Sequence, residues 1–295
     1  RTRPMPNFRT LIAAEELAAM LDDCVVIDCQ HNLMDREAGP AAYAKRHIPG
    51  AWHLHMDDDL ASHGGPAEEG RHPLPDAAGL RATLMAMGMT PQKQLVAYDA
   101  AGGASAARLW WLARWLGFPN SAVLDGGLPA WQAANFPVST EGRSLDKPVQ
   151  ADSDVAQQLG TLKVVDTEQL VTNLLSNQYL VVDARAAERY RGETEPLDPV
   201  AGHIPGSISR PLQNNLRPDD ARFKPAPVLR KEFEELLAGR EASTVVHSCG
   251  SGVSACHNLL AMEHAGLSGG ILYPGSWSAW CADRDRPVAK GPHAS

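Results

Sequence analysis

Residues 247–260, HSCGSGVSACHNLL, place Cys249 between an apolar run and the pattern of a helix start. The residues after the cysteine are nearly all small, so the backbone can curl tightly and turn successive N–H groups toward one centre, while the helix N-terminus adds its positive end. Such surroundings favour the nucleophilic thiolate form of a cysteine. We predict that Cys249 is a catalytic nucleophile. The residues expected to offer it backbone donors are Gly250, Ser251, Gly252, Val253 and Ser254.

The other four cysteines are expected to be small buried hydrophobes: Cys24, Cys29, Cys256 and Cys281. Five is an odd number and the positions are scattered, which argues against a disulfide framework and favours the reducing cytoplasm as the location. One alternative stays open. Cys249 and Cys256 could form a dithiol switch, depending on the side of the helix on which Cys256 lies.

The sequence contains an internal repeat. VVIDCQ followed by HIPGA in the first half recurs as LVVDAR followed by HIPGS in the second, and the two HIPG histidines, His47 and His203, are 156 residues apart. Farther along, residues 95–117 match residues 244–266 at an offset of 149. The first half therefore holds about seven extra residues, and the segment SHGGPAEEGRHPLP reads as the inserted loop. A repeat of this length indicates duplicated domains, which we place at 1–145 and 160–295, with a polar linker over 139–163.

Each half predicts the same fold. Short β-branched runs alternate with helical patterns, which is typical of an α/β fold with a mostly parallel sheet, helices on both faces, and chemistry at the C-terminal ends of the strands. In the second half a helix is expected from about Ser254 to Ala265, ended by Gly266. At the offset of 149, the position of Cys249 corresponds to Ala100, with Asp99 before it. The first half thus keeps the scaffold and lacks the nucleophile.

Composition excludes several function classes. The net charge is -8 and no Lys/Arg cluster is present, which argues against nucleic acid as a partner. No stretch of about 18 apolar residues predicts a membrane span. His53 and His55 in HLHMDDD lack the spacing of a metal motif, so we expect no metal and no organic cofactor. A tyrosine-phosphatase loop needs an arginine six residues after the cysteine, where this chain has Ala255.

The paired HIPG motifs together with CGSGVSAC resemble the tandem-domain sulfurtransferases of the rhodanese superfamily, over essentially the whole chain. The resemblance implies two rhodanese-like domains and a ping-pong reaction, in which Cys249 takes sulfur from a small-molecule donor as a persulfide and passes it to cyanide, a thiol or a dithiol. The loop is most similar to that of the mercaptopyruvate-using branch, because the thiosulfate-using branch usually carries basic residues there. Thiosulfate as donor, and a non-catalytic sulfur-relay or binding module, remain the alternatives.

The same resemblance implies a substrate-binding arginine. Arg189 in DARAAERYRG matches the residue that holds the donor's carboxylate, with a surface ion pair to Glu188 or Glu193 as the alternative and Arg185 as the weaker candidate. The branch often supplies a second arginine from a Glu-Pro-Arg segment. Here ETEPLDPVAGH has Leu197 and Asp198 instead, so the second contact is missing or comes from elsewhere, with Arg210 as a candidate.

Two further features follow from the resemblance. Ser251, with Asp57 and His72 of the first half, matches a catalytic relay of the mercaptopyruvate branch. Trp277 in GSWSAW suits a pocket wall, although Ala279 stands where relatives often carry an acidic residue.

Overall fold

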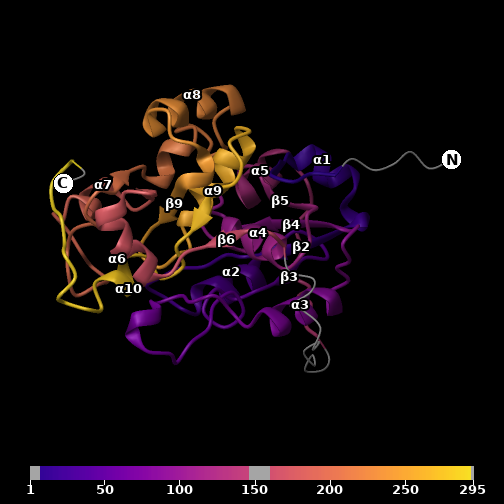
Figure 1. The fold of residues 1–295 in the computed structure, drawn as a ribbon. Helices are drawn as coiled ribbons and strands as arrows, with labels where there is room; N and C mark the ends of the chain where they lie inside the picture. The colour runs from indigo at the N-terminus through magenta and orange to yellow at the C-terminus, as the bar shows by residue number, and fades with distance from the viewer. Residues whose placement is uncertain (1–6, 146–159, 294–295) are drawn as a thin grey trace. The chain divides into compact units, whose positions relative to one another are not determined.

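Each half of the repeat forms a five-stranded parallel sheet in the computed structural model, which describes residues 7–145 and 160–293 (Figure 1). The strand orders are β1-β5-β4-β2-β3 and β6-β10-β9-β7-β8, which are the same order when the two halves are aligned. Every strand pairing within these sheets is parallel. The predicted α/β fold with two parallel sheets is confirmed.

The strands of the first sheet are β1 (Leu11–Ile12), β2 (Cys24–Asp28), β3 (Trp52–His53), β4 (Gln94–Tyr98) and β5 (Ser121–Leu124). Those of the second are β6 (Lys163–Val164), β7 (Leu180–Asp183), β8 (Ile208–Ser209), β9 (Val245–Ser248) and β10 (Ile271–Leu272). The helices of the first half are α1 (Ala14–Ala19), α2 (Ala38–Lys45), α3 (Ala77–Ala86), α4 (Ala106–Trp115) and α5 (Gly127–Ala133). Those of the second half are α6 (Thr167–Ser176), α7 (Ala187–Tyr190), α8 (Ala226–Leu237), α9 (Ala255–His264) and α10 (Ser276–Trp280).

The central strands are buried because both faces of a parallel sheet are covered, and they include polar residues such as His247 beside the apolar ones. All five residues of β4 and all four of β9 are buried. The helix that follows each of them ends at a glycine in the left-handed region, with φ +87° at Gly117 and +78° at Gly266. The helix predicted from about Ser254 to Ala265 is α9, with Ser254 as its N-cap.

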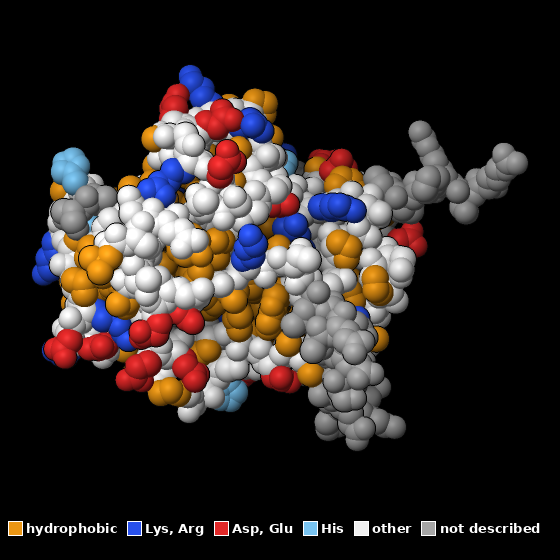
Figure 2. All heavy atoms as spheres, viewed as in Figure 1, with side chains coloured by type: hydrophobic (Ala, Val, Ile, Leu, Met, Phe, Trp, Pro, Cys, Tyr) orange, Lys and Arg blue, Asp and Glu red, His pale blue; other side chains and the backbone are white. Residues whose placement is uncertain are grey.

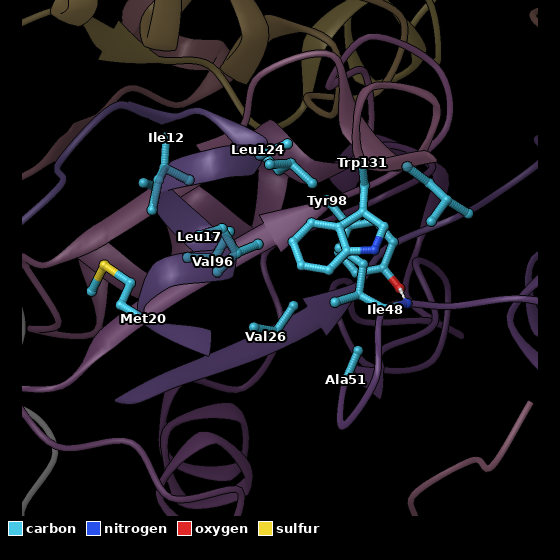
Figure 3. Close-up of a cluster of buried hydrophobic side chains, with 13 residues drawn as sticks. Ile12, Leu17, Met20, Val26, Ile48, Ala51, Val96, Tyr98, Leu124 and Trp131 are labelled. Atoms are coloured by element: carbon cyan, nitrogen blue, oxygen red, sulfur yellow. Dashed lines mark hydrogen bonds between the residues drawn. The ribbon is translucent and has the colours of Figure 1, made fainter. Parts of the chain in front are cut away.

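The first sheet is held by a cluster of buried side chains drawn in Figure 3. Val26 and Val96 lie on the neighbouring strands β2 and β4, and Leu17 of α1 and Trp131 of α5 belong to the same cluster. The hydroxyl of Tyr98, at the end of β4, accepts the Ile48 N–H at 3.1 Å. Each large apolar side chain of this cluster stabilises the fold by about 1.5–3 kcal/mol when fully buried. The cluster therefore holds the strands of the first sheet in place.

The chain divides by packing into two units. Of the described residues, the first comprises 7–60, 75–145, 160–161 and 220–222, and the second comprises 61–74, 162–219 and 223–293. The predicted domain boundaries, 1–145 and 160–295, remain a prediction, and much of the proposed linker lies outside the described residues. What the sequence did not indicate is that residues 61–74, most of the inserted loop, pack with the second unit.

The surface is mixed in charge. On the face drawn in Figure 2, acidic and basic side chains both occur and no continuous basic tract is seen. Within the ranges that the structure describes, no helix has the length and apolar character needed to cross a membrane.

Candidate active site

Cys249 directly follows β9, and α9 begins six residues later. Its side chain is buried, and the sulfur accepts the Gly252 N–H with an Sγ···N distance of 3.1 Å. Gly252 has φ +80°, and a Cβ there would lie 2.5 Å from the Pro274 carbonyl oxygen, so only glycine fits. The loop therefore turns a backbone donor onto the sulfur, as the sequence indicated.

The start of α10 braces this loop from the other side. The Ser276 hydroxyl accepts the Cys249 N–H at 3.0 Å, and the N–H groups of Trp277 and Ser278 donate to the carbonyls of Cys249 and Gly250 at 3.0 and 2.9 Å. Trp277 is itself fixed, since its indole N–H donates to the Val200 carbonyl at 2.8 Å. These bonds fix the main chain on both sides of the nucleophile.

Arg189 lies against the loop, close to Cys249. If Gly250 carried a Cβ, it would lie 3.5 and 3.6 Å from the two terminal nitrogens of Arg189. The guanidinium is an ion-pair partner, but of the buried carboxylates of Glu195 at 2.7 Å and Asp198 at 3.4 Å. The alternative of a surface pair with Glu188 or Glu193 is wrong in its partners, because Glu193 pairs with Arg191 instead.

A second guanidinium reaches the same place and was not singled out from the sequence. Arg71 Nη1 lies 2.7 Å from Asp198 Oδ1, and Nη2 lies 3.2 Å from where a Cβ of Gly250 would be. The signal was available in GRHPLP, where Arg71 directly precedes the predicted relay histidine. Charge alone could not identify it, because most loop arginines are solvated.

His72 and Ser251 are in contact, as the resemblance implied. The ring Nδ1 lies 2.7 Å from the serine Oγ, and both side chains are buried. Ser251 is two residues after Cys249, so this pair lies within the nucleophile's loop. A hydroxyl bonded to an imidazole can donate to, or exchange a proton with, a third group.

Comparison with known proteins agrees with this geometry. The family model of the rhodanese-like domain matches residues 13–134 and again residues 166–283. The chain belongs to the rhodanese family. It is 44% identical over 284 residues to a Pseudomonas aeruginosa protein provisionally named a 3-mercaptopyruvate sulfurtransferase, covering 95% of this chain and 98% of that one. It is 36% identical over 294 residues to a Mycobacterium tuberculosis protein provisionally named a thiosulfate sulfurtransferase, covering 96% and 98%.

A solved structure extends the likeness to the fold of both rhodanese domains. The 3-mercaptopyruvate sulfurtransferase from Leishmania major superimposes with a TM-score of 0.79 at 29% identity, covering 94% of this chain and 75% of that one. The resemblance read from the paired motifs and the CGSGVSAC loop is therefore confirmed at the level of the family.

Arg185 takes a structural position in the second rhodanese unit. Its guanidinium pairs with both oxygens of the Asp183 carboxylate, donates to the Gly202 carbonyl at 2.7 Å and lies over the Trp277 ring at 4.9 Å. Burial acts to lower the pKa of Arg185, but the carboxylates of Asp183 and Glu195 outweigh it and raise that pKa. Arg185 thus fixes the ring of Trp277 by stacking on it, and the role of Trp277 as a pocket wall stays a prediction.

Arg210 does not lie free to bind a donor. It donates to the Asn215 side chain at 3.1 Å, the Asn214 carbonyl at 3.0 Å and the Glu232 carboxylate at 2.7 Å. These bonds use the Nε and Nη2 nitrogens of the guanidinium.

Asp57 belongs to the other rhodanese unit, and its place in the relay stays a prediction. Its carboxylate lies 3.7 Å from the Arg36 guanidinium and 4.0 Å from the ring of His55. His31, His55 and Asp57 offer potential metal ligands within 4.8 Å of one another. The His55 ring already uses both nitrogens, donating from Nε2 to the Arg36 carbonyl and accepting the Asp57 N–H at Nδ1. A metal would have to displace one of these bonds, so the cluster offers no ready ligand set.

The remaining cysteines differ from Cys249 in their surroundings. Burial, with the charge of Asp23, raises the pKa of Cys24 to about 11, and burial with the charge of Asp198 raises that of Cys281 to about 11. Burial also raises the pKa of Cys29 well above its usual range. These thiols stay protonated at neutral pH. Cys256 is fully buried, with its sulfur 3.5 Å from the Gly252 carbonyl, and all five cysteines are free thiols.

Proposed function

We propose that this chain is a sulfurtransferase that takes sulfur from 3-mercaptopyruvate, carries it as a persulfide on Cys249, and passes it to a thiophilic acceptor. The observation that carries the proposal is the position of Cys249, buried in a glycine loop whose backbone N–H points at its sulfur, beside a guanidinium from Arg189. A buried nucleophile next to a carboxylate-binding fork suits a small 2-oxo acid that carries sulfur.

The first half-reaction is a sulfur transfer to the thiolate. The Cys249 sulfur attacks the donor's thiol sulfur, an S–S bond forms, and the donor's C–S bond breaks with its electron pair going to carbon. The carbon product is the enolate of pyruvate, which takes a proton at carbon to give pyruvate, while the new persulfide loses its sulfur-bound proton. Backbone donors of the loop stabilise the negative charge on the persulfide.

Negative charge also develops on the donor's keto oxygen as the C–S bond breaks. The Ser251 hydroxyl, bonded to His72 at 2.7 Å, is the group of this loop suited to donate to that oxygen. In this proposal the His72 ring exchanges a proton with the hydroxyl, and Asp57 is proposed as the third member of the relay.

Charge balance favours a monoanionic donor over thiosulfate. The ionic cluster beside the loop holds three arginines and three carboxylates, so its formal charges cancel: Arg71, Arg185, Arg189, Asp183, Glu195 and Asp198. Because a buried dianion needs full compensation, a neutral cluster with a guanidinium fork fits a carboxylate better.

In the second half-reaction the acceptor attacks the outer persulfide sulfur, the S–S bond breaks, and the Cys249 thiolate is regenerated. Cyanide would leave as thiocyanate, and a thiol or dithiol would leave as its own persulfide. No metal or organic cofactor takes part in this scheme, and no nucleic-acid partner is proposed. A reducing cytoplasm is the compartment in which free thiols and thiol acceptors fit best.

The test is a comparison of donors with cyanide as acceptor, measured as kcat/KM for 3-mercaptopyruvate and for thiosulfate. We expect a clear preference for 3-mercaptopyruvate, and mass spectrometry of protein mixed with donor alone should find one added sulfur atom on Cys249. Cys249→Ser should lower turnover by about 10⁴-fold or more, because the covalent carrier is gone.

Thiosulfate is the second candidate donor, since one relative carries that provisional name. A preference for thiosulfate would contradict the charge argument above and move the assignment to that donor. If neither donor is turned over by a folded protein whose Cys249 still reacts with iodoacetamide, the chain is a relay or binding module instead.

A further inference from the structure

Residues 61–74 bring an arginine to the nucleophile's loop from a part of the sequence far from it. The Arg71 N–H donates to the Ser278 hydroxyl at 3.0 Å, and the Ser278 N–H donates to the Gly250 carbonyl at 2.9 Å. Gly70 makes the approach possible: it has φ +89°, and a Cβ there would lie 2.7 Å from the Gly275 carbonyl oxygen. One serine thus links the backbone of Arg71 to the residue next to Cys249.

The side chain of Arg71 converges with that of Arg189. Terminal nitrogens of the two lie 3.2 and 3.5 Å from the position that a Cβ of Gly250 would take. Between them stands Asp198, whose Oδ1 is 2.7 Å from Arg71 and whose Oδ2 is 3.4 Å from Arg189. The Asp198 side chain is only 4% exposed, so it holds both guanidiniums from the protein side.

Each of the two guanidiniums has a buried Nε–H donor. The Nε atoms of Arg71 and Arg189 are buried and have no hydrogen-bond partner among the residues that the structure describes. A buried N–H without an acceptor is costly, and a carboxylate with an adjacent keto oxygen supplies acceptors for charged N–H donors. The Arg71 side chain is 27% exposed, so a small anion can reach it from solvent.

We propose that Arg71 is a second donor-binding residue, which shares the carboxylate of the 2-oxo acid with Arg189, and that Asp198 is the positioning residue for the pair. This inference rests on the proposed function. It assigns the cation that a Glu-Pro-Arg segment would have supplied. Here Leu197 follows Glu-Pro, and the next residue, Asp198, pairs with Arg71 from residues 61–74.

The first experiment measures steady-state kinetics of Arg71→Gln in the full chain, with 3-mercaptopyruvate and cyanide. Loss of charge-assisted hydrogen bonds to a carboxylate should lower kcat/KM by about 10- to 100-fold. The loss should appear mainly in KM, because the carboxylate is bound equally before and during C–S cleavage. Arg191→Gln is the matched control: Arg191 pairs with exposed Glu193, and its kinetics should equal those of the wild type.

The second experiment separates donor binding from a structural role. Pyruvate should protect Cys249 from iodoacetamide in the wild type, and Arg71→Gln should need about 10- to 100-fold more pyruvate for the same protection. The rate of alkylation without pyruvate should be unchanged. Equal protection and equal KM in the two proteins would overturn the inference and leave Arg71 as a structural partner of Asp198.

Arg71→Lys keeps the test decisive if the glutamine variant does not fold. Lysine keeps the charge but lacks the planar fork, so we expect its KM to rise above that of the wild type, by less than the roughly 10- to 100-fold expected for a neutral side chain. A wild-type KM would overturn the inference. Absence of both turnover and protection by pyruvate in the wild type would instead overturn the proposed function itself, and this inference with it. If the wild type turns over 3-mercaptopyruvate while Arg71→Gln is unaffected, only the role of Arg71 fails.

Discussion

The two rhodanese units build the same loop around different acceptors of backbone N–H groups. In the first unit the buried carboxylate of Asp99 accepts four backbone N–H groups, those of Ala101, Gly103, Ser105 and Ala106, at 2.8–2.9 Å. In the second, position 248 is a serine, and the Gly252 N–H, the counterpart of the Gly103 N–H, donates to the Cys249 sulfur.

The difference shows what makes one loop reactive. A curled loop at a helix start gathers N–H groups that favour negative charge. In the first unit the Asp99 carboxylate itself occupies these N–H donors. In the second unit no carboxylate stands at the corresponding position, so the charge can come from a thiolate or from sulfur attached to it. The first unit thus has Ala100 where the second has Cys249, and a carboxylate of its own at the N–H donors of the loop.

Among the substitutions that test the difference between the two loops, we expect Gly252→Ala to have the largest effect on activity. The alanine Cβ would lie 2.5 Å from the Pro274 carbonyl oxygen, and the alanine would have to adopt φ +80°. The N–H that faces the Cys249 sulfur must therefore move. We expect kcat/KM with 3-mercaptopyruvate and cyanide to fall by about 100-fold, the size of effect seen when one backbone-type donor is lost from an anion site.

Gly239→Ala is its control. Gly239 also has a positive φ, +88°, but a Cβ there would meet nothing within 4 Å, so it carries the backbone strain without the clash. Its activity should stay near that of the wild type, while both variants lose stability by about 1 kcal/mol from strain. Equal losses of activity in the two variants would mean that donation from the Gly252 N–H to the Cys249 sulfur is not needed for activity.

A cysteine placed in the first loop tests the same difference between the loops, and the expected change in its alkylation rate is smaller. In a Cys249→Ser background, Ala100→Cys places a thiol in the first loop beside Asp99, and Asp99→Ser with Ala100→Cys removes the competing carboxylate. The adjacent negative charge disfavours a thiolate and also holds the N–H donors, so the double replacement should alkylate at residue 100 about tenfold faster than the single one. The measurement is the rate of iodoacetamide labelling at residue 100, followed by mass spectrometry. If both variants label at one rate, Asp99 does not suppress the first loop.

Much of the difference between the two loops could be predicted from the sequence, because it depends on which residue types stand at matched positions of the two halves. Cys249, its small neighbours and the Ala100–Asp99 pair are visible by aligning the two halves, and the strands and helices follow from short apolar runs ended by glycine. The contact of His72 with Ser251 was also expected, though only through a resemblance.

What escaped prediction depends on contacts between segments far apart in the chain. Arg71 is one charged residue in a polar loop, and its neighbours Asp198 and Ser278 are 127 and 207 residues away. No periodicity or spacing encodes such a meeting. The bracing of the Cys249 N–H by Ser276 is hidden in the same way, because a serine near a helix start is common and its partner is set by the fold.

The smallest expected effect concerns the strand residue before each loop, Tyr98 in β4 and His247 in β9. Burial raises the pKa of Tyr98, so that side chain stays neutral over the whole working range. Burial lowers the pKa of His247 to about 3, and neither ring nitrogen has a hydrogen-bond partner among the described residues. Unfolding returns that pKa to about 6.5, so between those values the unfolded chain binds a proton that the folded one does not. Stability from this group is therefore lost as the pH falls.

Between pH 7 and pH 5.5 the loss should be about 1 kcal/mol in the free energy of unfolding of the wild type, relative to His247→Leu. Urea denaturation of both proteins at the two pH values measures it, and the difference between them cancels every other titrating group. The leucine variant should also be no less stable than the wild type at pH 7, because it removes two buried polar atoms that no partner satisfies. A parallel fall in both proteins would show that His247 gains a proton, or a partner, inside the folded sheet, and the contrast with Tyr98 would then not extend to their titration.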